Sequence, residues 1–505
     1  MELRTLANSP GRTDECNGAE SQPLARHSYE EALRNHDDPR TRWPRDEDTQ
    51  LARLKPFCQP AIRASFSISP EDPIFTIGSC FARNIEQHLI GQGFNVAVAR
   101  FEQLCQDEGI HVKSNTLNKF VAQSILNELR WALQPEAEFP LESIVEVKAG
   151  RYLDMQLAPG LLPTKLDTAL ATRRAISSYM RLVKDAKVVI VTLGLAEAWY
   201  DTLLGLYTNT MPMQATAERY PGRFEHHVLE YNQLLGCLRE ILALLENYGH
   251  PDFRMILTVS PVALSSTFTE NDALVANCYS KAVQRAAAEA ICRENPRVDY
   301  LPSFESVTLS EHSFAWREDR AHVSTEVVRL NVLRMEDAYA APAQRKARDH
   351  LFDANRVQAL QLASEAVQLF KSGEGDRADE LFERAVNVAP DEVLPHVQWG
   401  DALYKRERWQ DAARELEAAS ELGGRRYNIG YQLAKCYAKL SQWPAAERAA
   451  KAALEDDPGN PRPYKIIAKA LKESGRTSEA ESYQTRYQQM AGPVVGTAGA
   501  SEGAR

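Results

Sequence analysis

The sequence predicts an α/β domain with a mainly parallel sheet, followed by an all-α repeat domain. Two observations support this fold class. Between residues 55 and 345, short apolar runs rich in β-branched residues alternate with longer helical runs. This alternation is typical of a parallel sheet covered by helices on both faces. Beyond residue 350, small residues recur with a period of 34, which is typical of stacked helix pairs.

The elements of the first domain follow from their apolar patterns. Short buried runs predict strands, and longer amphipathic runs predict helices. The expected strands are Ile74–Ile77, Val96–Ala99, Val188–Leu193, Met255–Val259 and Val298–Leu301. The expected helices are Phe81–Leu89, Leu117–Leu133, Asp167–Val183, Glu225–Asn247 and Ala273–Arg293. Because parallel sheets bind ligands at the carboxyl ends of their strands, the residues that follow these strands are the first site candidates.

The repeat domain is expected over residues 350–490. A small residue is needed where two helix backbones cross closely, and a 34-residue period resembles the tetratricopeptide repeat. A plain helical bundle is the alternative. A repeat stack predicts a concave groove for a protein or peptide partner, or for docking against the first domain. The markers are Ala378, Ala412, Ala446 and Ala480, then Ala385, Ala419 and Ala453, with Pro390, Gly424 and Pro458 at the unit ends.

Composition narrows the function classes. The net charge of −10 argues against a nucleic-acid-binding surface. The chain contains no apolar run of about 18 residues, so no membrane span is expected, and the first residues contain no signal-peptide core. Its eight cysteines form no metal-binding spacing, and no nucleotide-binding loop is present, so no cofactor or metal is expected. Scattered cysteines are typical of a cytoplasmic protein.

Residues 1–54 are expected to be a disordered or loosely packed arm, and residues 491–505 a disordered tail.

Ser79 lies where the first predicted strand runs into a helix. Gly78-Ser79-Cys80 places one hydroxyl on a tight turn, where a nucleophile can stand clear of the sheet. The alternative is an ordinary helix N-cap, since serine is a preferred cap. The Gly-x-Ser-x-Gly elbow of α/β-hydrolases is absent.

Asp319 and His322 could supply the remaining parts of a catalytic triad. A serine nucleophile needs a base, and that base needs a carboxylate to orient it. The Asp-x-x-His spacing allows both side chains to reach one site from a single loop. The alternative is a solvated charged loop, because Arg317, Glu318 and Arg320 surround the pair.

Several segments together resemble the GSCFA family, which is named after the residues found here at 78–82. The similar segments are residues 75–82 (Phe-Thr-Ile-Gly-Ser-Cys-Phe-Ala), 192–199 (Thr-Leu-Gly-Leu-Ala-Glu-Ala-Trp), 258–262 (Thr-Val-Ser-Pro-Val), 276–281 (Ala-Asn-Cys-Tyr-Ser-Lys) and 319–324 (Asp-Arg-Ala-His-Val-Ser). Val323 stands where the family usually has proline. The resemblance covers about residues 70–335 and leaves the repeats outside.

The family resembles the SGNH (GDSL-like) hydrolases and acyltransferases. That resemblance implies a three-layer α/β sandwich with Ser79 as nucleophile, His322 as base and Asp319 as the orienting carboxylate. It also implies an oxyanion hole made by the serine N–H, a glycine and an asparagine. Gly194 occupies the glycine's loop, but Ala196-Glu197 stands where the asparagine would be, so Asn115 is the candidate amide. Gly78 completes the nucleophile turn.

Other residues near these motifs allow two interpretations each. Glu197 could bind a substrate hydroxyl or the catalytic histidine, or be a buried carboxylate with a structural partner. Cys80 could be a rival nucleophile near a helix N-terminus, although a small buried side chain is favoured. Lys281 could be a surface charge or bind an anionic substrate. His226-His227 is expected to be exposed.

Three hypotheses follow. The first is a serine esterase or acyltransferase that acts on an O-acyl group of a carbohydrate or acylated metabolite. The second is a non-catalytic scaffold that binds a protein or peptide through residues 350–490. The third is a cysteine enzyme that uses Cys80.

Overall fold

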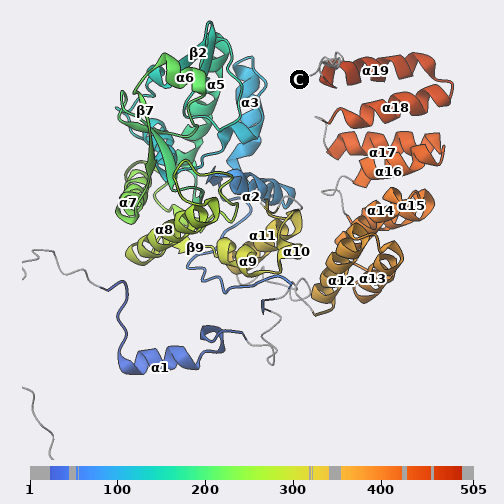
Figure 1. Cartoon of the computed structure of the whole chain (residues 1–505), viewed down its shortest axis with the longest axis horizontal. Coiled ribbons are helices and arrows are strands. Elements are labelled where there is room, and N and C mark those ends of the chain that lie inside the picture. Colours follow the sequence, from blue (N-terminus) through green and yellow to red (C-terminus); the bar gives the residue numbers. More distant parts are fainter. Residues whose placement is uncertain are drawn as a thin grey trace, which may run out of the picture.

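A computed structural model describes residues 23–44, 53–54, 56–317, 320, 322–340, 354–423, 429–456 and 460–491. Figure 1 shows an α/β domain with a stack of helices beside it. The helix α1 (Tyr29–Asp37) belongs to the N-terminal arm and buries no residue. A short 3₁₀ helix, η1 (Pro39–Thr41), follows it. The tail after residue 491, which the sequence predicts to be disordered, lies outside the described residues.

The main sheet is parallel, as the sequence predicts. Within the described residues it has four strands in the order β1, β4, β8, β9. Ile74 pairs with Val188, and Val188 pairs with Arg254, which fixes the register of the first three strands. These strands read as continuous apolar runs because helices cover both faces. The strands are β1 (Ile74–Gly78), β4 (Val188–Leu193), β8 (Arg254–Val259) and β9 (Val298–Tyr300).

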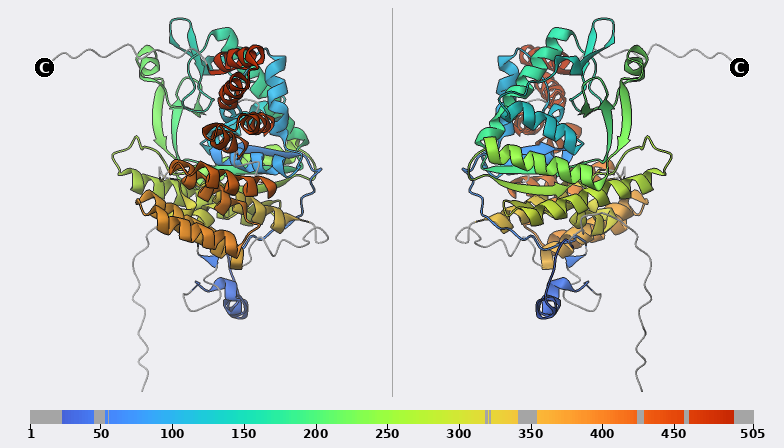
Figure 2. Two further views of the ribbon diagram at one scale, coloured as in Figure 1. Left: turned by 90° about the vertical axis from the view of Figure 1, so that its right-hand side faces the viewer. Right: turned by 90° about the vertical axis from the view of Figure 1, so that its left-hand side faces the viewer.

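Two apolar cores lie on opposite faces of this sheet. Successive strand residues point to opposite faces, so Phe75 and Ile77 enter one core while Ile74 enters the other. The first core contains α3 (Phe101–Asp107), α4 (Ala122–Leu133), α5 (Leu166–Met180), α7 (Tyr231–Tyr248) and α8 (Ala273–Glu294). The second contains α2 (Cys80–Gly91), α9 (Ser303–Leu309), α10 (His312–Ala315) and α11 (Thr325–Tyr339). The expected three-layer sandwich is confirmed, and α7 and α8 are visible on one side in Figure 2.

The α/β domain contains further strands outside the main sheet, and these were not predicted from the sequence. A hairpin pairs β2 (Ile144–Lys148) with β3 (Arg151–Asp154). An antiparallel sheet has the order β6 (Leu206–Thr208), β5 (Glu197–Asp201), β7 (Phe224–Val228). The helix expected over Glu225–Asn247 is therefore wrong at its start, because residues 224–228 form β7 and α7 begins at Tyr231. The remaining short elements are α6 (Gln214–Arg219), η3 (Ala97–Arg100), η4 (Ser114–Leu117), η5 (Leu141–Ser143) and η6 (Arg181–Asp185).

Two further predictions need correction at the start of the domain. The strand expected over Val96–Ala99 is wrong, since Val96 makes only an isolated bridge to Ile74 before the chain turns into η3. The helix expected from Leu117 begins at Ala122. The intervening loop is held to the sheet edge instead, where the N–H of Lys119 donates to the carbonyl of Gly78 at 2.7 Å.

The C-terminal domain consists of tetratricopeptide-like repeats, as the sequence predicts. Each consecutive pair of helices packs together, with α12 against α13 and α14 against α15. All seven alanines that define the 34-residue period are buried. Pro390 follows a helix end as expected, whereas Gly424 and Pro458 lie outside the described residues. The helices are α12 (Ala354–Lys371), α13 (Gly375–Val388), α14 (Val393–Lys405), α15 (Trp409–Glu421), α16 (Ile429–Lys439), α17 (Trp443–Asp456), α18 (Arg462–Glu473) and α19 (Thr477–Ala491).

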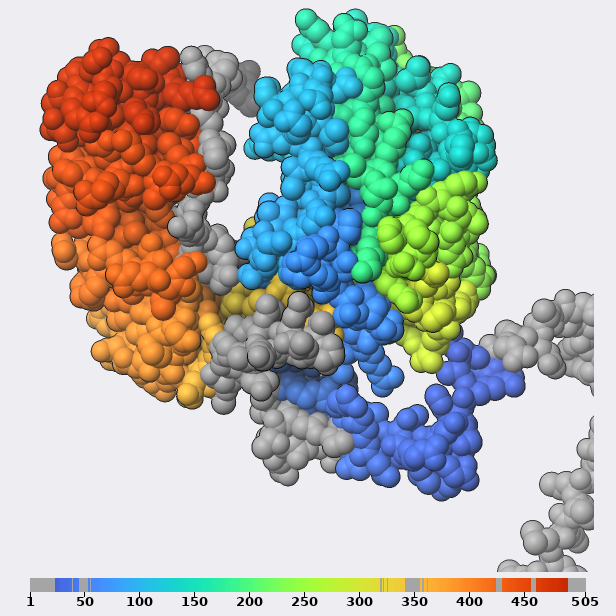
Figure 3. All heavy atoms as spheres, turned by 180° about the vertical axis from the view of Figure 1, so that it is seen from behind, coloured from blue at the N-terminus to red at the C-terminus, as the bar shows by residue number. Residues whose placement is uncertain are grey.

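The first repeat helices join the α/β domain. Leu360 of α12 and Leu394 of α14 are buried in the same apolar core as Phe314 of α10. Figure 3 shows the repeats meeting the α/β domain at this end of the stack, with a hollow between the last repeats and the domain. None of the described helices combines the length and apolar character needed to span a bilayer.

Candidate functional site

The turn between β1 and α2 requires glycine at its first position. Gly78 has a φ of +140°, and a Cβ there would lie 2.3 Å from both the carbonyl oxygen and the hydroxyl oxygen of Thr192. Only glycine combines this backbone conformation with such a close approach to a neighbouring strand. Gly78 thus allows the chain to turn sharply and to place Ser79 directly at the N-terminus of α2.

Ser79 is buried and forms hydrogen bonds with its immediate surroundings. Its hydroxyl accepts the N–H of Phe81 at 3.3 Å, so Ser79 is the N-cap of α2. Its own N–H donates to the hydroxyl of Thr192 at 2.9 Å. The backbone donor expected to serve the oxyanion is therefore occupied in this structure.

Gly194 follows β4 at the same carboxyl edge and supplies an unused donor. It is buried, and a Cβ on it would lie 2.6 Å from the carbonyl oxygen of Phe120. Its carbonyl accepts Nζ of Lys281 at 2.7 Å and Nε2 of Gln284 at 3.2 Å. Its own N–H has no hydrogen-bond partner among the described residues. A buried backbone N–H is rarely left unpaired in a folded protein, so this group is a candidate oxyanion donor.

The structure favours Asn118 over Asn115 as the amide near the nucleophile turn. Asn115 is exposed in η4. Asn118 is buried, and its side-chain oxygen Oδ1 has no hydrogen-bond partner within the described part of the chain. It also directly precedes Lys119, whose N–H is bonded to Gly78. The sequence gives both asparagines in one loop, and only the fold distinguishes the buried one from the exposed one.

The loop with His322 shares an apolar core with the helix that begins at Ser79. Val323, which follows the histidine, is buried in the same apolar core as Phe81 of α2 and Phe314 of α10. Burial raises the pKa of the Cys80 thiol, and the charge of Arg317 acts against that rise. The side chain of His322 is exposed, and its carbonyl accepts the N–H of Arg317 at 2.8 Å. Asp319 lies outside the described residues.

Cys80 is a poor candidate for a nucleophile. Burial raises the pKa of its thiol above the usual range, although the charges of Lys281 and Arg317 act in the opposite direction. The thiolate, not the thiol, is the reactive form of cysteine. A thiol with a raised pKa is mainly protonated at neutral pH.

Glu197 is a buried carboxylate with structural partners. It accepts the hydroxyl of Thr267 at 2.7 Å and the N–H of Phe268 at 3.1 Å. Nε2 of His226 lies 3.2 Å from the carboxylate. His226 is half-buried, not exposed as expected, and burial lowers the pKa of its imidazole more than Glu197 raises it. These contacts join β5 and β7 to the loop that follows β8. The ring of Trp199 packs edge-on against His226 and against Phe268.

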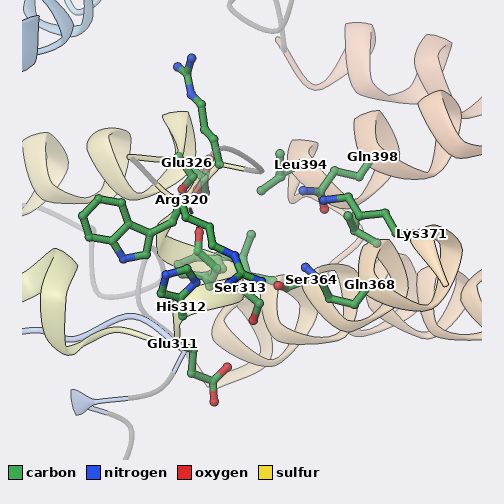
Figure 4. A pocket seen from close by; sticks show the side chains of 16 residues that line it. Glu311, His312, Ser313, Arg320, Glu326, Ser364, Gln368, Lys371, Leu394 and Gln398 are labelled. Carbon is green, nitrogen blue, oxygen red and sulfur yellow. Dashed lines mark hydrogen bonds between the residues drawn. The ribbon is translucent and has the colours of Figure 1, made fainter. Parts of the chain in front are cut away.

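A separate cavity of about 1110 Å³ lies between the α/β domain and the first repeats. Figure 4 shows side chains from the α10 region on one side and from α12 and α14 on the other. Its walls are polar and apolar in about equal parts and include Arg320, which precedes the predicted histidine by two positions. Other lining residues are Glu311, His312, Glu326, Gln368, Lys371 and Gln398. Among the described residues, no group of His, Cys, Asp or Glu side chains is arranged to hold a metal ion.

Comparison with known proteins now identifies the first domain. The model of the GSCFA family matches residues 73–334, which is just over half of the chain. The chain belongs to the GSCFA family. The matched region begins at β1 and ends within α11, so it contains the turn with Ser79, the Gly194 loop and the His322 loop.

The comparison with solved structures concerns the helical repeats. One crystal structure of MamA is 19% identical and covers 32% of this chain and 91% of its own, with a TM-score of 0.25. MamA from Desulfovibrio magneticus RS-1 is 18% identical and covers 27% and 77%, with the same TM-score. These values are too low to support an argument about what the present repeats bind. No curated protein matched the chain.

Proposed function

We propose that this GSCFA protein is a serine-dependent esterase or acyltransferase that acts on an O-acyl group. In this mechanism the hydroxyl of Ser79 attacks the acyl carbonyl carbon while His322 accepts the hydroxyl proton. The tetrahedral intermediate collapses, the alcohol leaves with a proton from His322, and an acyl-enzyme remains. Water or another alcohol then takes the acyl group. Asp319 is assigned the role of orienting His322.

The observation that carries this proposal is a backbone donor without a partner among the described residues, the N–H of Gly194, at the edge that holds Ser79. The N–H of Gly194 makes no hydrogen bond among the described residues, and the side chain of Asn118 is buried with its acceptor oxygen Oδ1 unpaired there. Gly194 directly follows β4, Asn118 belongs to the loop held against the end of β1, and the loop with His322 shares an apolar core with α2. Donors reserved for a developing negative charge are typical of acyl transfer, where each is worth roughly 100- to 1000-fold in rate.

A fluorophosphonate probe tests the proposal on the full-length protein. Attack by Ser79 would form a phosphorus–oxygen bond and release fluoride, with the hydroxyl proton passing to the base. We expect mass spectrometry to find the label on Ser79 in the wild type and in Cys80→Ala, and to find none in Ser79→Ala. We expect His322→Gln to reduce the labelling rate at least roughly 100-fold, within the usual range for loss of a general base. Folded wild-type protein without label on Ser79 would reject the proposal.

A second candidate function is a non-catalytic scaffold in which the repeats bind a protein or peptide. Two observations favour it: the hydroxyl of Ser79 caps its own helix, and the side chain of His322 is exposed. The carbohydrate or metabolite substrate of the first proposal would then have no role. Crosslinking of the full chain in cell extract would test partner binding. A variant in which a substitution at Gly400 of α14 disrupts the repeats serves as the control. The scaffold proposal expects a partner that depends on the repeats, together with no label on Ser79.

A further inference from the structure

Three polar side chains of α8 hold the loop that follows β4. The hydroxyl of Ser280 accepts the N–H of Ala196 at 2.9 Å. Lys281 and Gln284 both donate to the carbonyl of Gly194, at 2.7 Å and 3.2 Å. All three side chains are buried, with exposed fractions of 1%, 2% and 1%. A helix segment of this polarity in a core is unusual, because buried polar groups cost free energy unless they are paired.

Among the described residues, Lys281 differs from the other buried bases of the domain because no acidic side chain there pairs with it. Lys119 and Arg173 both form ion pairs with the buried carboxylate of Glu128. In the part of the chain that the structure describes, no carboxylate forms an ion pair with Lys281. Its hydrogen-bond acceptor is the carbonyl of Gly194. An unpaired buried ammonium destabilises a fold, so its presence beside one particular loop calls for a functional reason.

The position of this ammonium relative to Gly194 suggests that reason. The carbonyl of Gly194 is fixed by Lys281 and Gln284, while the N–H of the same residue has no partner in the described segments. Lys281 therefore constrains the residue whose N–H is the candidate oxyanion donor, and places a positive charge close to it. Its charge also acts on Cys80, the residue next to Ser79.

We propose that Lys281 is a positioning residue of the acyl-transfer site, which holds Gly194 in place and supplies the positive charge that stabilises the oxyanion. The inference rests on the proposed function, because it needs a negative charge to develop at this edge of the sheet. In water-excluded surroundings a fixed charge of this kind interacts more strongly than it would in solvent. Gln284 contributes a neutral hydrogen bond to the same carbonyl, so it serves as the matched comparison.

The test measures two quantities on full-length Lys281→Met and Gln284→Met at pH 6. The first is the second-order rate constant for fluorophosphonate labelling of Ser79. We expect Lys281→Met to be labelled roughly 10- to 100-fold more slowly, and Gln284→Met within about threefold of the wild type, because the first variant loses a charge and the second loses only the neutral amide that donates to Gly194 and Ser280. The second is the urea midpoint of unfolding, which we expect to stay unchanged or to rise in Lys281→Met.

The two readouts separate a functional role from a structural one. A merely structural lysine would lower the urea midpoint when replaced, whereas an unpaired charge retained for the reaction would not. Labelling of Lys281→Met at the wild-type rate would overturn the inference while leaving the proposed function intact. A lower urea midpoint with a proportional loss of labelling in both variants would also overturn it. Wild-type protein that is not labelled on Ser79 would reject both proposals.

Discussion

The hydroxyl of Thr192 lies 2.9 Å from the backbone nitrogen of Ser79 and 3.4 Å from its hydroxyl oxygen. Thr192 belongs to β4, and Ser79 directly follows β1, where Gly78 pairs with Thr192. Thr192 thus occupies the N–H that an SGNH-like site would direct at the oxyanion. It also contacts the hydroxyl that would attack. In the state described here, Thr192 therefore contacts both the backbone donor and the hydroxyl of Ser79.

Replacing Thr192 by valine should free the N–H of Ser79 from its hydrogen bond. Valine keeps the shape of threonine but cannot accept the N–H of Ser79. An unpaired buried N–H costs about 1–3 kcal/mol, so the free energy of unfolding should fall by that amount. The freed N–H can then bind the phosphonyl oxygen, and labelling of Ser79 should accelerate roughly tenfold or more. Thr192→Ser keeps the hydroxyl and should leave both quantities nearly unchanged. Slower labelling of Thr192→Val would show that the Thr192 hydroxyl assists the reaction.

The glycine of the turn gives a second prediction. In Gly78→Ala the new Cβ would stand 2.3 Å from the backbone oxygen of Thr192, in a backbone conformation that disfavours side chains. We expect a loss of stability of at least about 3 kcal/mol, since strain and overpacking add. Gly222→Ala is the control: its φ is also positive, at +74°, but open space surrounds the Cβ position. The control should lose only about 1 kcal/mol. Equal losses in urea denaturation would show that the contact with Thr192 is not the cause.

Much of this architecture was predictable from the sequence because the central strands are buried on both faces. The predicted bounds of β4 agree with the structure, and those of β1 and β8 are within one residue. The run at Val96 failed because a short apolar segment can form a single bridge and then leave the sheet. The strand β7 was missed because Glu225, His226 and His227 carry no apolar alternation.

The candidate site was predictable only where it directly follows a strand. Ser79 and Gly194 occupy such positions, and strand ends converge in a parallel sheet. Burial of Lys281 was not predictable, because its partner Gly194 is 87 residues away in sequence and their contact depends on how α8 packs. The same limit applies to Asn118, whose burial depends on a loop pressed against Gly78.

Lys281 also makes stability depend on pH. Burial lowers the pKa of its ammonium to about 7, well below the unfolded value, while the thiol of Cys80 on α2 acts in the opposite direction. Between pH 7 and about 10, the unfolded chain therefore binds more protons at this residue than the folded chain does. Stability rises with pH in that interval. The free energy of unfolding of the wild type should therefore rise relative to that of Lys281→Met as the pH is raised from 7 to 10. The expected difference is up to a few kcal/mol, at about 1.4 kcal/mol per pKa unit. Parallel curves of unfolding free energy against pH would contradict the predicted shift.

The carboxylate of Glu197 should be needed to hold the loop after β8. One oxygen accepts the hydroxyl of Thr267, and the other accepts the N–H of Phe268 and lies beside His226. Glutamine has a single acceptor oxygen, so Glu197→Gln must lose one of these bonds. We expect a loss of about 1–2 kcal/mol and faster proteolytic cleavage within residues 263–271. The matched control is Glu225→Gln on β7, whose carboxylate pairs with His227 but is mostly exposed. Exposed pairs contribute about 0–1 kcal/mol, so its cleavage rate should match the wild type. Equal cleavage of the two variants would show that Glu197 does not secure this loop.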